Sequence, residues 1–194
     1  MRNLLDLSLS EKKESLIVMF IFVAVNSLIT MYAFYVWPES LSTIEPYTVS
    51  LMHIEDAAKN FCLGFIVLFP SRKLRSMILA GLLSVLLDVD HAPSLLGFEA
   101  PIRPAHSILF ILLINACLWL VFRRLDFILI TNAAIFSNLT LDVYFFPFFL
   151  PLSFQYINLT GHYAFLVWLL PAICFGCFTM MVGSKPTKRG PLKT

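Results

Sequence analysis

Long hydrophobic runs alternate with short polar connections along the whole chain. A helical segment needs roughly 20 residues to cross a hydrocarbon core, and the runs predict six helical spans. We place these spans at residues 15–37, 51–69, 74–88, 105–123, 126–143 and 161–182. Tight basic connections follow the second and fourth spans, whereas the connections 38–50, 89–104 and 144–160 are longer and less regular.

Composition supports a membrane environment. Hydrophobic residues make up 59% of the 194 residues and charged residues 13%, about half the charged share of an ordinary soluble domain. The pattern predicts an all-α, polytopic membrane bundle forming one domain, residues 1–194. Within it we expect a cytoplasmic N-terminal segment (1–14), six spans (15–182) and a basic cytoplasmic tail (183–194). The first run is longer than the apolar region of a cleaved signal peptide, so it should remain as a span.

The connections sort the charges into two groups. One side carries every basic residue except Lys59 and Arg103. The opposite side carries all four histidines and most of the carboxylates. The members near the predicted span ends are His53, Glu55, Asp56, Asp88, Asp90, His91, His106, Asp142 and His162. Short basic connections stay cytoplasmic, so both termini should be cytoplasmic and the histidines should face outward. The predicted location is therefore the plasma membrane, with the site on its extracytoplasmic side.

The outward polar residues fall at one depth near the ends of four predicted spans. On the second span, His53, Asp56 and Asn60 follow helical spacing and share a face. The other groups are Asp88-Val-Asp90-His91, Arg103-Pro-Ala-His106-Ser107, and Asn138 with Asp142. A carboxylate inside a bilayer costs about 2.5–3.5 kcal/mol even on the lenient insertion scale. Groups this costly are paired with one another or bound to a cation.

Imidazole and carboxylate groups together are typical ligands of a divalent metal, with zinc first and manganese or iron as alternatives. The predicted ligands are His53, Asp88, His91, His106 and Asp142. A catalytic metal lowers the pKa of bound water toward about 7. Asp56 is then the candidate general base, Arg103 the candidate anion clamp, and Asp90 a further candidate of the catalytic set.

Simpler interpretations of these residues remain open. Asp88 and Asp90 could cap a helix end, and the histidines could be ordinary interfacial residues. Asp142 could pair with Arg103 without any metal. The whole set indicates a metal site more strongly than any single residue does, because every histidine of the chain falls at the same depth on one side.

These same elements resemble a family of membrane-bound, metal-dependent hydrolases, also described as LexA-binding, inner-membrane-associated hydrolases. The corresponding pieces are His53, Asp88-Val-Asp90-His91, Arg103-Pro-Ala-His106-Ser107, Asn138-Leu-Thr-Leu-Asp142 and Phe146-Pro147-Phe148. The resemblance covers about residues 51–150 and implies hydrolysis at a metal site. The chain departs from the family at Ile102 and Asn138, where histidines are expected, and at Ala105, where threonine is expected.

Three functions are consistent with the sequence. The leading hypothesis is a membrane-embedded, metal-dependent hydrolase that acts on a lipid or lipid-linked ester or phosphoester. A second is a non-catalytic subunit or scaffold that binds a membrane protein partner. A third is a small cation transporter, although Asn26, Asn115 and Asn132, the main polar residues at mid-depth, are not ionisable. The expected partners are membrane lipids, and no basic stripe suits nucleic acid.

Overall fold

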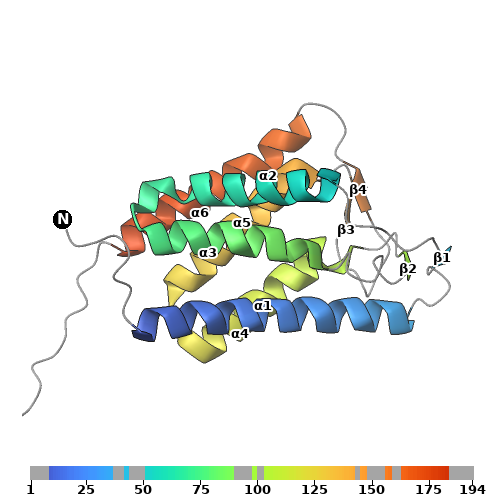
Figure 1. The fold of residues 1–194 in the computed structure, drawn as a ribbon, viewed down its shortest axis with the longest axis horizontal. Helices are drawn as coiled ribbons and strands as arrows, with labels where there is room; N and C mark the ends of the chain where they lie inside the picture. The colour runs from blue at the N-terminus through green and yellow to red at the C-terminus, as the bar shows by residue number, and fades with distance from the viewer. Residues whose placement is uncertain are drawn as a thin grey trace, which may run out of the picture.

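The computed structural model describes residues 9–36, 42–43, 51–89, 98–99, 103–142, 145–147, 156–158 and 163–183. Within these ranges the fold is an all-α bundle of six α-helices (Figure 1). The helices are α1 (Leu9–Val36), α2 (Leu51–Val67), α3 (Leu74–Leu86), α4 (Ile108–Phe122), α5 (Leu125–Asp142) and α6 (Tyr163–Gly183). Each of the six predicted spans corresponds to one helix, so the prediction of an all-α fold is confirmed.

The starts of two helices differ from the predicted spans: α1 begins earlier and α4 begins later. Helix α1 begins at Leu9, six residues before the predicted span, with Glu11 in its first turn, where a negative charge is favourable. Helix α4 begins later than predicted. Pro104–His106 forms the short 3-10 helix η4, and Ser107 then caps α4 by accepting a hydrogen bond from the Phe110 backbone amide.

Two short strand pairs accompany the helices. Strand β1 (Ser42–Thr43) pairs antiparallel with β2 (Phe98–Glu99), and β3 (Phe145–Pro147) pairs antiparallel with β4 (Tyr156–Asn158). All four strands lie beyond the same end of the bundle, on the right in Figure 1. The sequence predicted only irregular connections in these regions, because strands of two or three residues leave no hydrophobic alternation to detect.

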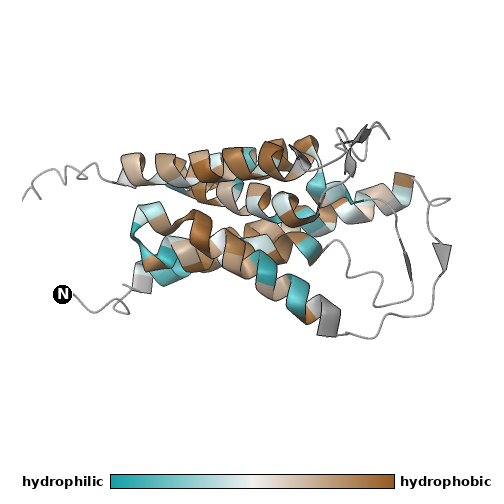
Figure 2. Cartoon of the chain, turned by 90° about the horizontal axis from the view of Figure 1, so that it is seen from above, coloured by the Kyte–Doolittle hydropathy of each residue, from teal (hydrophilic) through white to brown (hydrophobic). Residues whose placement is uncertain are grey.

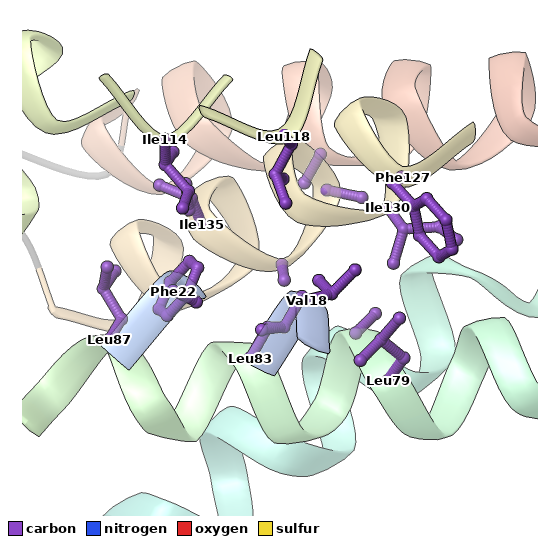
Figure 3. Packing of buried hydrophobic residues seen from close by; sticks show 14 of the residues in the cluster. Val18, Phe22, Leu79, Leu83, Leu87, Ile114, Leu118, Phe127, Ile130 and Ile135 are labelled. Atoms are coloured by element: carbon purple, nitrogen blue, oxygen red, sulfur yellow. The ribbon is translucent and has the colours of Figure 1, made fainter. Parts of the chain in front are cut away.

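Apolar side chains from all six described helices meet in the core. Val18 and Phe22 of α1 face Leu79, Leu83 and Leu87 at and after α3, beside residues of α4 and α5 (Figure 3). Helix α2 packs closely along α3, where a Cβ on Gly64 would lie 2.8 Å from the Ala80 carbonyl oxygen. Helix α6 packs along α5. The core therefore runs along the bundle axis and joins every helix to at least one neighbour.

Charged residues tie the helices together at one end, which we call the basic end (Glu14, Arg75, Arg124 and Asp126). Glu14 of α1 accepts hydrogen bonds from Arg75 of α3 (3.3 Å) and from Arg124 in the α4–α5 turn (2.8 Å). The paired hydrogen bonds of Arg124 to Asp126 are the main reason that the pKa of its guanidinium lies above the ordinary value. Both guanidinium groups also lie over the Phe127 ring.

The outer surface of the described bundle is strongly apolar. Helices α1 and α6 contain segments, Ser10–Ala33 and Phe165–Val182, that are long and apolar enough to cross a membrane. The whole helices α1 and α6 have 28 and 21 residues, which correspond to roughly 42 and 31 Å of helix. The hydrocarbon core of a bilayer is about 30 Å thick. Figure 2 shows hydrophobic residues along the middle of the helices and hydrophilic residues mainly toward their ends.

Candidate functional site

A cluster of polar side chains surrounds Asp88 at the end of the bundle opposite the basic end. Asp88 lies in the turn that continues α3. It accepts hydrogen bonds from Asn60 of α2 (2.9 Å), from Arg103 beside η4 (3.3 Å) and from Asn138 of α5 (3.2 Å to each carboxylate oxygen). His106 Nε2 lies 3.7 Å from Asp88 Oδ1. We call Asn60, Asp88, Arg103, His106 and Asn138 the Asp88 cluster.

The cluster ranges from fully buried to partly exposed. Asn138 is fully buried and His106 is 1% exposed, whereas the side chains of Asp88 and Arg103 are 28% and 24% exposed. The ion pair of Asp88 and Arg103 therefore lies at the surface of the bundle, above the buried side chains of Asn138 and His106. The pair could contact a ligand that approaches from outside, while the amides hold the carboxylate in place.

Hydrogen bonds, one set between helices and one set local, hold the elements that carry the cluster. Asn26 of α1 donates from Nδ2 to the carbonyl oxygens of Leu86 and Leu87, at 3.2 and 2.9 Å. These carbonyls lie at the end of α3, where backbone acceptors lack helical partners. Asn26 thereby fixes the turn that carries Asp88. Ser107 performs the same role for His106, because its hydroxyl donates to the Pro104 carbonyl oxygen at 2.6 Å and also caps α4.

Three of the residues predicted from the sequence are brought together and a fourth is not. Asp88, Arg103 and His106 lie within one network, as expected from their common depth. Asp56, the candidate base, has a 66% exposed side chain 3.6 Å from Lys59. Within the described contacts Asp56 belongs to this surface pair and takes no part in the Asp88 cluster.

The other predicted residues lie wholly or partly outside the described part of the chain. Asp90, His91 and His162 lie outside the described residues, as do the side chains of His53 and Asp142. The backbone puts His53 in the first turn of α2 and Asp142 at the end of α5. Among side chains that the structure describes, no three His, Cys, Asp or Glu residues lie close enough to hold one ion. The five-ligand metal site thus stays a prediction.

Two amides contribute more than the sequence indicated. The sequence placed Asn60 on a polar helix face, and Asn138 with Asp142 in the outward polar set and at a position where the resembled family has histidine. Both donate to Asp88, and Asn138 also bonds His106 and the Ser84 carbonyl oxygen. The available signal was the presence of a carboxamide on an apolar helix, which in a bilayer requires a hydrogen-bond partner. The identity of that partner depends on helix packing.

No family model, curated protein or solved structure matches this chain. The resemblance to membrane-bound hydrolases therefore rests on the short motifs alone. Any functional conclusion depends on the geometry of the Asp88 cluster and on the apolar surface around it.

Proposed function

We propose that the chain is a multi-pass membrane protein that crosses the bilayer six times, with the basic end in the cytoplasm. The apolar outer surface supports this proposal. Large residues such as Phe20 on α1 and Leu120 on α4 are 75% and 74% exposed, an arrangement that suits lipid tails better than water. The segment Phe165–Val182 of α6 has only 17% of its residues buried within the chain, as expected for a helix that faces lipid on most sides.

The function that we propose is metal-dependent hydrolysis of a lipid or lipid-linked ester or phosphoester at the Asp88 cluster. The observation that carries it is the meeting of a partly exposed carboxylate and guanidinium with a buried imidazole. Asp88 and His106 would be ligands, and Arg103 would bind the anionic part of the substrate. A bound divalent ion would supply an activated water and polarise the scissile bond. Since the site lies at the surface of the proposed bilayer, a lipid head group could reach it without leaving the membrane.

Metal content tests this proposal directly. Detergent-purified protein should contain about one or two zinc, manganese or iron ions per chain, the numbers found in single-ion and two-ion hydrolytic sites. The His106→Gln variant should lose at least one of them, because an imidazole ligand is removed. Elemental analysis of both proteins, after dialysis and reloading with each ion, measures the difference. The variant Lys59→Gln is the control, since Lys59 lies near the same end and contacts only Glu55 and Asp56 among the described salt bridges.

Retention of the same metal by His106→Gln would contradict the site, and wild-type protein that binds none of the three ions would contradict metal dependence. If metal is bound, screening of lipid, lipid-linked ester and phosphoester substrates follows. Activity should then disappear in His106→Gln and persist in Lys59→Gln.

The proposed orientation makes a separate prediction. In a background lacking native cysteines, Glu55→Cys should react with a membrane-impermeant maleimide in intact cells, whereas Lys73→Cys should react only after permeabilisation. Both positions are exposed and lie at opposite ends of the bundle. Short basic connections favour the cytoplasm, which is the reason for this asymmetry. Labelling of Lys73→Cys in intact cells, with Glu55→Cys protected, would reverse the orientation.

A second candidate is the non-catalytic membrane subunit. Asp88 already accepts hydrogen bonds from two amides and one guanidinium, so the network can hold four elements together without a metal. Such a network would fix the shape of a surface that binds a partner protein. Copurification of a stoichiometric membrane protein with metal-free, well-folded chain would support this function over hydrolysis.

A further inference from the structure

The orientation of the Asn138 side-chain amide is determined by its neighbours. Nδ2 lies 2.9 Å from the Ser84 carbonyl oxygen and 3.2 Å from both carboxylate oxygens of Asp88. All three neighbours are acceptors. Exchanging the nitrogen and oxygen of this amide would place Oδ1 against three oxygens and lose every one of these hydrogen bonds. Asn138 therefore presents Nδ2 to Asp88 and Ser84, and Oδ1 to the opposite side.

That opposite side is occupied by the His106 imidazole. His106 Nε2 lies 3.1 Å from Asn138 Oδ1. Because Oδ1 can only accept, Nε2 must carry a hydrogen and donate it. The side chain of Asp88, whose Oδ1 is 3.7 Å from the same nitrogen, also favours a proton there. Since His106 and Asn138 are both almost fully buried, water cannot readily replace this hydrogen bond.

We infer that Asn138 is a positioning residue that fixes the His106 proton on Nε2, so that Nδ1 is the nitrogen through which His106 binds a divalent ion. The part concerning the ion rests on the proposed function, whereas the proton position does not. Histidines that bind metals through one nitrogen usually donate the other N–H to an oxygen, which sets the tautomer and the ring orientation. Asn138 Oδ1 is that oxygen here. The asparagine thus has a specific role at the position where the resembled family carries a histidine.

Nitrogen NMR of protein selectively labelled with ¹⁵N-histidine tests the inference. His106 is assigned by the signal that disappears in His106→Gln. In metal-free wild type, its Nε2 should show a directly bonded proton that exchanges slowly with solvent. Adding Zn²⁺ should shift Nδ1 while the proton stays on Nε2. In Asn138→Leu, which keeps the branching and the number of heavy atoms of the side chain, the Nε2 proton should exchange rapidly, and Zn²⁺ affinity should fall about 10- to 100-fold.

Asn132→Leu is the matched control. Asn132 lies on the same helix and forms a reciprocal amide pair with Asn115 at 3.2 Å, away from the Asp88 cluster. This control should lose stability but keep the slow Nε2 proton and the Zn²⁺ affinity. An unprotonated or zinc-bound Nε2 in wild type would overturn the inference, whether or not Asn138→Leu folds. A slow Nε2 proton without any Zn²⁺ binding would support the proton position and overturn metal-dependent hydrolysis.

Discussion

Asp88→Asn is expected to lower the free energy of unfolding by about 2 to 4 kcal/mol. The substitution preserves the shape of the side chain but replaces one acceptor oxygen by an NH₂ donor. The neighbouring groups of Asn60, Arg103 and Asn138 are themselves donors, so at least one of them then faces another donor. The ion pair with Arg103 is also lost, because the asparagine side chain carries no charge. The estimate lies below the cost of breaking a fully buried pair because the Asp88 side chain is 28% exposed. Chemical unfolding in detergent, followed by circular dichroism, measures the change.

Asp126→Asn provides the comparison for Asp88→Asn. The side chain of Asp126 is 25% exposed and pairs with Arg124, whose side chain is 42% exposed. This change at the basic end should cost only about 1 kcal/mol, because one partly exposed ion pair and a favourable helix N-terminal charge are lost. Equal, small losses in both variants would show that the Asp88 hydrogen bonds do not stabilise the bundle.

The hydrophobic runs were sufficient to predict the six helices, because a helix in an apolar environment must satisfy its own backbone. The predicted starts at 51 and 74 coincide with those of α2 and α3. The start of α1 was missed. Glu11 and Glu14 looked like part of a solvated segment, but both contact Arg75 of α3. Such contacts between distant parts of the chain extend a helix and leave no periodic pattern in the sequence.

The candidate site was predictable in its location and only partly in its contacts. Common depth was enough to bring Asp88, Arg103 and His106 together. The helix face shared by Asp56 and Asn60 was less informative. Spacing along a helix shows which side chains point the same way, but it does not show where along that face a neighbouring helix ends. Asn60 lies one turn deeper than Asp56 and meets the end of α3, whereas Asp56 lies beyond it, beside Lys59.

Phe22→Ala should destabilise the bundle by about 3 kcal/mol, near the lower end of the range for buried phenylalanines. Phe22 is fully buried in the core, and its ring meets Phe110 of α4 edge to face, with centroids 5.3 Å apart. Truncation leaves a cavity between α1, α3 and α4. If the bundle lies in a membrane as proposed, the loss should be smaller than in water-soluble proteins, because transfer between a helix interface and lipid tails has little hydrophobic driving force. What remains is the lost van der Waals packing, measured by thermal unfolding in detergent.

Phe20→Ala is the matched control, since it changes the same residue type on the same helix, two positions away. Phe20 is 75% exposed, so its removal should alter the free energy of unfolding by less than about 0.5 kcal/mol. A surface-facing phenylalanine in a water-soluble bundle would be expected to reduce solubility, whereas in a membrane bundle it contacts lipid in both the folded and the unfolded, inserted states. The contrast between the two variants therefore tests both the packing of α1 and the proposal that its exposed side faces lipid. Comparable losses at both positions would mean that α1 does not present these two faces as described.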